Sequence, residues 1–174
     1  MKIRCDIHLE SGDSKLILAP KPEEKVDHLA LKLAGFLMFL PMGPVVEPSS
    51  DHPSLFGYDV KPDVMAMDAG GDILLWLECG EVSINKLDKV SRRLVRGRIV
   101  VLKKSLREAK QLRERMGDEV RQSQRVEVWT WPAGEFERWV GAMQEKTEIF
   151  GEAHEKSFNL VVNETPYAVD LVQV

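Results

Sequence analysis

The chain has 174 residues and a formal net charge of −4; hydrophobic residues make up 44% of it and charged residues 30%. These proportions are those of an ordinary globular protein and exclude wholesale disorder. The length predicts one domain, over residues 1–174, with a substantial core. No apolar stretch is long enough to span a bilayer, and the first ten residues lack the apolar run of a signal peptide. Because its two cysteines, Cys5 and Cys79, fit a reduced cytosol, we expect a soluble cytoplasmic protein with no membrane partner.

The amino-terminal half is expected to contain two short strands, one long helix and a strand hairpin. The two strands cover 2–9 and 14–19, and the helix covers 22–40, where apolar residues recur at helical spacing. Residues 41–61 form a long connection with a short strand around Val45 and Val46. The sequence Asp-Ala-Gly-Gly at 68–71 then predicts a tight turn between a strand that follows Pro62-Asp63 and a strand at 72–79.

The carboxy-terminal half is expected to alternate helices and strands. The predicted helices are 84–96, 104–116 and 134–146; the predicted strands are 98–102, 125–130 and a closing hairpin of 156–163 and 166–173. Alternation from 72 to 130 predicts parallel strands joined by right-handed crossovers, and the hairpins add antiparallel strands. The expected fold class is therefore α/β, with one mixed central sheet flanked by helices.

Positive charge is concentrated in one part of the chain. Residues 86–125 hold 14 Lys and Arg against 5 Asp and Glu, so this segment is strongly basic within an acidic protein. Such a segment predicts a surface that contacts phosphates, which makes DNA or RNA the expected partner. The alternative is a pair of solvated helices whose arginines cover apolar surface. The acidic chain as a whole argues against tight non-specific binding of long nucleic acid.

Two carboxylates are expected to meet at one edge of the sheet. Asp63 and Glu78 lie on the two strands of the hairpin near residue 70, each about eight residues from the turn. In register they end close together, and two carboxylates can hold a Mg²⁺ ion that is completed by water and a substrate phosphate. Such an ion would activate water and neutralise charge on a phosphodiester. Taken singly, either acid would more simply cap a helix or pair with an arginine.

A third acid could come from the first predicted helix. Glu24, Asp27 and His28 share one helical face, opposite the apolar stripe. In isolation this pattern is that of a solvated polar face. It becomes a candidate part of a site only if the helix packs beside Asp63 and Glu78.

The same residues carry a resemblance to a known family. Pro62-Asp63 followed by Glu78-Cys79-Gly80 resembles the PD-(D/E)xK nuclease superfamily, and within it the chain is similar to the YaeQ family. The family's pattern is found in Glu24-x-x-Asp27-His28-x-x-x-Lys32-Leu33, Pro62-Asp63, Asp68 and Gly71-Asp72-Ile73-x-Leu75-Trp76-Leu77-Glu78-x-Gly80. The similarity extends over nearly the whole chain.

The resemblance implies a restriction-endonuclease-like PD-(D/E)xK core with added hairpins. Asp63 and Glu78 would be the metal ligands, with Mg²⁺ or Mn²⁺ as the ion, and Glu24 or Asp27 would lie nearby. YaeQ-like proteins carry a glycine, here Gly80, where the superfamily has the lysine that orients water and stabilises transition-state charge.

A lysine from the next helix is expected to replace the superfamily lysine, whose position is occupied here by Gly80. Lys86 and Lys89 are three residues apart on one helical face, and Lys32 is a third candidate. The alternative for Lys86 and Lys89 is the exposed face of a basic helix.

Three functions are consistent with the sequence. The leading hypothesis is a Mg²⁺-dependent phosphodiesterase that acts on nucleic acid. The alternative, favoured by Gly80, is a non-catalytic module that retains the nuclease fold and binds nucleic acid or protein. A protein-interaction module that uses the acidic faces and residues 41–61 is the third.

Overall fold

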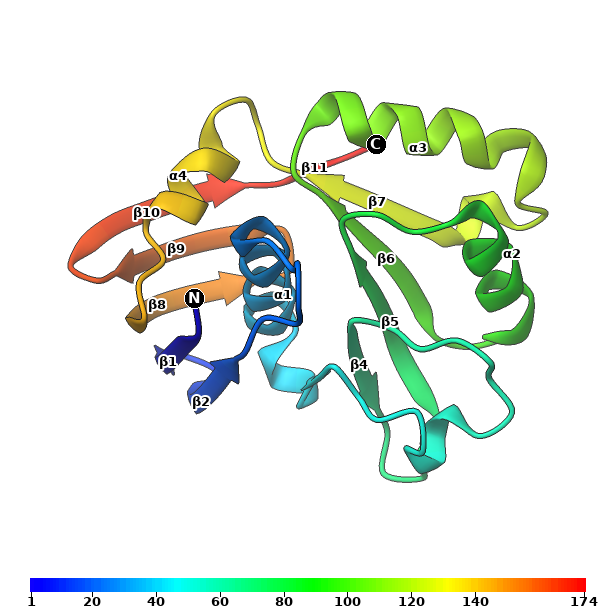
Figure 1. Cartoon of the computed structure of the whole chain (residues 1–174), viewed down its shortest axis with the longest axis horizontal. Helices are drawn as coiled ribbons and strands as arrows, with labels where there is room; N and C mark the ends of the chain where they lie inside the picture. Colours follow the sequence, from blue (N-terminus) through cyan, green and yellow to red (C-terminus); the bar gives the residue numbers. More distant parts are fainter.

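The computed structural model describes residues 1–174 and contains two β-sheets with one helix between them (Figure 1). The first sheet has five strands in the order β10-β9-β8-β1-β2: β1 (Ile3–Leu9), β2 (Gly12–Leu18), β8 (Lys146–His154), β9 (Ser157–Val162) and β10 (Thr165–Asp170). The second has six strands in the order β11-β7-β6-β5-β4-β3: β3 (Val45–Val46), β4 (Val64–Met67), β5 (Ile73–Cys79), β6 (Arg98–Lys103), β7 (Val126–Thr130) and β11 (Val172–Gln173).

The helices are α1 (Val26–Met38), α2 (Ile84–Arg93), α3 (Leu106–Glu119) and α4 (Glu135–Gly141), with 3₁₀ turns η1 (Leu40–Met42), η2 (Pro53–Leu55) and η3 (Ser123–Arg125). The predicted α/β class is therefore confirmed, as is the parallel arrangement of β5, β6 and β7. None of the helices combines the length and the apolar composition that a bilayer crossing requires.

Helix α1 lies at the centre of the molecule, between the two sheets (Figure 1). Its residues are buried without interruption from Leu29 to Met38, so the helix is covered on all sides. A Cβ atom on Gly35 would lie only 3.0 Å from a side-chain methyl carbon of Leu77, and the glycine therefore lets α1 pack closely on β5. This packing brings the start of α1 to the end of the second sheet where the predicted acids lie.

The start of α1 differs from the prediction. The helix begins at Val26, four residues later than expected, because Pro22 is followed by Glu23 in a left-handed conformation with φ of 67°. Glu24 consequently lies in the turn before the helix, where its side chain accepts a hydrogen bond from the Lys21 N–H at 2.8 Å.

The opposite face of the second sheet is covered by α2 and α3. Alternate residues of β5, β6 and β7 pack into this layer, among them Trp76, Val101 and Val128. The predicted cap at Ser83 is confirmed, since its hydroxyl accepts a hydrogen bond from the Lys86 N–H at 3.1 Å. Helix α2 ends at Arg93, three residues earlier than expected.

The prediction of one mixed sheet was wrong, because the strands divide between two sheets. The predicted helix 134–146 ends at Gly141, and after a four-residue connection the chain enters β8, which pairs in parallel with β1. Thr147 and Ile149 point inward while Lys146 and Glu148 point outward, which is the alternation of a strand. β8 supplies the neighbour on which β1 and β9 assemble a separate sheet.

Candidate functional site

Asp63 is fixed at the end of β5, as the hairpin register predicts. It directly precedes β4, and its backbone N–H donates a hydrogen bond to the Leu77 carbonyl at 3.1 Å. Its side-chain Oδ2 accepts a hydrogen bond from the Cys79 N–H at 2.7 Å. The carboxylate of Asp63 is thereby held next to the residue that follows Glu78.

Glu78 is the buried acid of the site, with 2% of its surface exposed. Its Oε1 accepts a hydrogen bond from the indole Nε1 of Trp76 at 2.9 Å and lies 2.6 Å from the Nζ of Lys86. Burial raises the pKa of Glu78 to about 7; the charge of Lys86 opposes this rise and the charge of Asp63 adds to it. Oε2 forms no hydrogen bond or ion pair within the chain.

The structure distinguishes the two lysines that the sequence left open. Lys86 lies in the first turn of α2, next to the end of β5, and its Nζ contacts both Glu78 and the Lys61 carbonyl, the latter at 2.7 Å. Lys89 lies almost one turn further along, where it pairs with the exposed Asp59 at 3.0 Å. Of these two lysines, only Lys86 therefore reaches Glu78.

Gly80 cannot be replaced by a lysine without strain. Its φ is +79°, a left-handed conformation that side chains other than glycine rarely adopt. Its N–H donates a hydrogen bond to the Leu102 carbonyl at 2.9 Å, which holds this conformation against β6. The left-handed backbone therefore explains why position 80 holds a glycine. The cation beside Glu78 is Lys86, which comes from α2.

Of the two acids predicted near α1, the structure brings only Glu24 to the site. Glu24 Oε1 lies 2.6 Å from His28 Nδ1, and His28 Nε2 lies 3.6 Å from Asp63 Oδ2. Asp27 points elsewhere and pairs with Lys104 at 3.2 Å near the surface. Glu24 thus acts on Asp63 through His28 and not by direct contact.

The pairing of His28 with Asp63 moves both pKa values. Asp63 raises the pKa of the His28 imidazole, although burial works in the opposite direction. Burial alone would raise the pKa of Asp63, but His28 and the Cys79 N–H together hold it below its usual value. Asp63 is therefore ionised at neutral pH.

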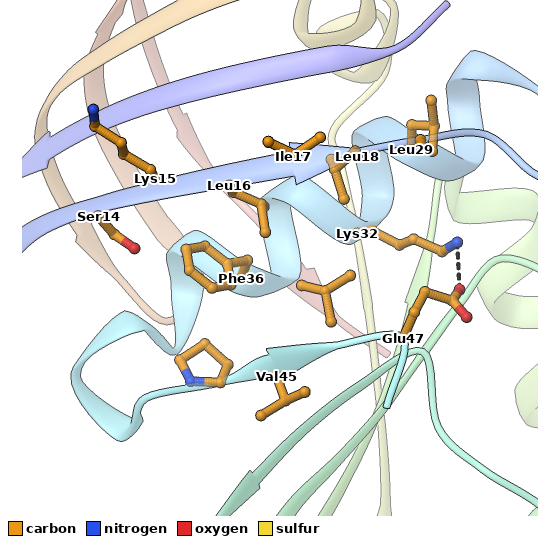
Figure 2. A pocket seen from close by; sticks show the side chains of 13 residues that line it. Ser14, Lys15, Leu16, Ile17, Leu18, Leu29, Lys32, Phe36, Val45 and Glu47 are labelled. Atoms are coloured by element: carbon orange, nitrogen blue, oxygen red, sulfur yellow. Dashed lines mark ion pairs between the residues drawn. The ribbon is translucent and has the colours of Figure 1, made fainter. Parts of the chain in front are cut away.

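Lys32 belongs to a buried ion-pair cluster behind the site. It is 2% exposed, contacts Glu24, and lies 2.5 Å from Glu47 Oε1. Burial lowers the pKa of Lys32, but these two acids more than compensate and raise it. Figure 2 shows Lys32 and Glu47 among the residues that line a cavity of about 570 Å³ between β2, α1 and β3. Lys32 is thus engaged by Glu24 and Glu47 and does not replace the lysine missing at Gly80.

Two residues of the site carry no clear signal in the sequence. Glu47 lies in the irregular connection before η2, and Lys61 contributes a backbone carbonyl, which no residue pattern reveals. His28 was visible only as part of a polar face. Its spacing of four residues from Glu24 was the available signal.

The acids of the site do not form a complete metal cage. No group of three or more His, Cys, Asp or Glu side chains is arranged to hold a metal ion. The candidate metal ligands are therefore the two carboxylates of Asp63 and Glu78. Oδ1 of Asp63 and Oε2 of Glu78 have no partner within the chain.

Part of the basic segment 86–125 is used internally. Arg113 donates hydrogen bonds to the carbonyls of Ser123, Val126 and Val174, and Arg125 donates to those of Ser91, Val95 and Gly97. Arg98 pairs with Glu127 and Glu155. Other basic side chains of the segment are exposed and form no ion pair: Arg93, Arg96, Arg107, Lys110, Arg115 and Arg121.

Comparison with known proteins places the chain in a family. A family model described as YaeQ protein matches residues 8–171. The crystal structure of the YaeQ protein from Xanthomonas axonopodis pv. citri is similar over 99% of this chain and 96% of that chain, with a TM-score of 0.74 and 15% identity.

The crystal structure of the YaeQ protein from Pseudomonas syringae is similar over 99% of this chain and 93% of that chain, with a TM-score of 0.71 and 15% identity. At this level of identity the two structures support the fold alone. No curated protein matches the chain. Because the family model spans nearly all of the sequence, the chain belongs to the YaeQ family.

Proposed function

We propose that this protein is a Mg²⁺-dependent phosphodiesterase that acts on nucleic acid, and that its second sheet corresponds to a restriction-endonuclease-like PD-(D/E)xK core. The observation that carries the proposal is the 2.6 Å contact between Lys86 Nζ and Glu78 Oε1. This contact supplies from α2 the cation that Gly80 cannot supply from the end of β5. Lys86 would then be the cation of the site, and Glu78 and Asp63 would be its two metal-binding carboxylates.

Asp63 and Glu78 would hold the ion. Their unpartnered oxygens, Oδ1 and Oε2, are the hard ligands that Mg²⁺ prefers, and Mg²⁺ usually needs only one or two protein carboxylates. When bound there, the ion would activate a water molecule and neutralise charge on the phosphodiester. Mn²⁺ accepts the same oxygen ligands and would substitute for it.

The remaining residues of the site would orient these groups. Lys86, held by the Lys61 carbonyl, would stabilise negative charge on the attacked phosphate and orient the attacking water. Glu24 fixes His28 through Nδ1, and His28 in turn keeps Asp63 ionised. Glu24 would therefore position His28 without touching the metal. Only Asp63 and Glu78 would bind the metal directly.

We expect the purified protein to cleave DNA or RNA when Mg²⁺ or Mn²⁺ is present and not when the metal is chelated. Asp63→Asn should reduce the cleavage rate by about 100-fold or more, because a metal ligand contributes at least as much as the groups that support one. The measurement is a cleavage assay on single-stranded and double-stranded oligonucleotides. Asp51→Asn, which neutralises an exposed acid with no ion pair, is the control. Cleavage that persists unchanged in Asp63→Asn removes Asp63 from the mechanism.

A second candidate function is a non-catalytic module that retains the nuclease fold and binds nucleic acid or protein. The left-handed backbone of Gly80 favours it, because a lysine cannot be restored at that position without strain. This alternative predicts no metal-dependent cleavage of any strand type. It also predicts that binding, if it involves phosphates, weakens as salt is raised.

A further inference from the structure

One side of α2 lies against residues 57–61, the segment that leads into Asp63. The contacts progress along the helix: Lys86 Nζ reaches the Lys61 carbonyl at 2.7 Å, and the guanidinium of Arg93 lies over the ring of Tyr58, 4.8 Å from its centroid. Lys86 and Arg93 are seven residues apart, which corresponds to about 10 Å along a helix. Arg93 is therefore two turns from the candidate site on the same side of α2.

Phe56 belongs to the segment that Arg93 contacts, and its side chain extends into solvent. It is 90% exposed, whereas the preceding Leu55 is buried and anchors the segment. Gly57 separates Phe56 from Tyr58 with φ of +80°, and a Cβ there would lie 2.3 Å from an Arg93 guanidinium nitrogen. The guanidinium thus occupies the space beside Gly57, the residue that follows Phe56.

Tyr58 connects this surface to the interior of the domain. The ring of Tyr58 packs on the buried Trp76, with 5.2 Å between the ring centroids. Trp76 in turn donates its indole hydrogen bond to Glu78. A continuous set of contacts therefore connects Arg93 to the candidate site, and Phe56 is joined to it through the backbone of Gly57 and Tyr58.

We propose that Phe56 and Arg93 form a platform that binds a single strand of nucleic acid and directs it toward Lys86 and Glu78. An exposed aromatic ring offers a face on which a base can stack, and an arginine beside it pairs with the neighbouring phosphate. A duplex cannot use the ring in this way because its base faces are already stacked. Lys89 is not part of the platform, since Asp59 neutralises it. The inference rests on the proposed function and specifies its substrate as single-stranded.

The test is the affinity of the full-length protein for a fluorescein-labelled 12-nucleotide oligo(dT) and for a 12-base-pair duplex, measured by fluorescence anisotropy in EDTA. We expect Phe56→Ser to weaken binding of the single strand by about tenfold or more, the size of one base–aromatic stack. Phe56→Trp should restore it, and the new indole fluorescence should be quenched by the oligonucleotide. Arg93→Gln should lower the salt dependence of log K by about 0.7, as expected for one phosphate contact.

The controls lie on the other sheet. Phe150→Ser removes an exposed aromatic ring from β8, and Lys146→Gln removes an exposed cation from the same strand. The proposal is overturned if the wild-type protein does not bind the single strand, if it prefers the duplex, or if Phe150→Ser weakens binding as much as Phe56→Ser.

Because EDTA prevents metal-dependent cleavage, binding is measured separately from the proposed activity. Binding that depends on Phe56 in a protein that never cleaves would contradict the phosphodiesterase and leave the platform intact. Cleavage that depends on Asp63 but not on Phe56 would contradict the platform alone.

Discussion

Lys86→Met is expected to lower the rate of phosphodiester cleavage by about 100- to 1,000-fold at saturating substrate. This is the loss measured when one preorganised donor to a developing oxyanion is removed. Lys86 is the only lysine that contacts Glu78, at 2.6 Å, and the Lys61 carbonyl holds it there before substrate binds. The measurement is the maximal cleavage rate of an oligonucleotide with Mn²⁺ or Mg²⁺.

The matched control for Lys86 is on the same helix. Lys89→Met removes a cation that pairs only with the exposed Asp59, so the maximal rate should change by less than about twofold. Thermal unfolding of both variants verifies that each is folded at the assay temperature. Equal losses of the maximal cleavage rate in the two variants would show that Lys86 acts only through its positive charge and has no specific role at Glu78.

Lys32→Met is expected to lower the free energy of unfolding by about 3 kcal/mol, because removal of one partner leaves buried charges uncompensated. Lys32 is 2% exposed, and the side chain of its partner Glu24 is 6% exposed. The side chain of the second partner, Glu47, is 25% exposed and is also paired with Lys21 at 2.8 Å. The more deeply buried Glu24 is therefore the more affected acid, although it keeps its contacts with His28 and the Lys21 N–H. The measurement is urea unfolding at pH 7.

The nature of this loss can be tested with two further variants. Lys21→Met removes the exposed partner of Glu47 and should cost less than about 1 kcal/mol. Combining Lys32→Met with Glu24→Gln and Glu47→Gln should recover much of the loss, since no buried charge is then left unpaired. A triple variant as unstable as Lys32→Met would instead assign the loss to packing around α1.

The sequence predicted those elements of the fold whose signal is local. Ser83 marked the start of α2, and the turn near residue 70 fixed the register of β4 and β5. The division into two sheets depends on the parallel pairing of β1 with β8, whose residues are far apart in the chain. That pairing leaves no local pattern, and the alternation at Thr147 and Ile149 was the only sign of β8.

The candidate site was predictable to a similar extent. Register alone predicted that Asp63 lies near Glu78. The resemblance implied that Gly80 stands where the superfamily has a lysine, from which a substitute lysine on α2 was our hypothesis. The choice between Lys86 and Lys89 required the orientation of α2 against β5. The role of His28 required the position of α1 between the sheets, which follows from the packing of Gly35 on Leu77.

A crystal structure of the protein soaked with Mn²⁺ tests the metal site most directly, because anomalous scattering identifies the ion. We expect one ion bound to Asp63 and Glu78, at about 2.0–2.2 Å from the carboxylate oxygens, with water in its remaining positions. Lys86 should stay within hydrogen-bond distance of Glu78. Carboxylates that remain engaged only with His28 and Lys86, with no ion between them at millimolar Mn²⁺, would contradict the proposed phosphodiesterase.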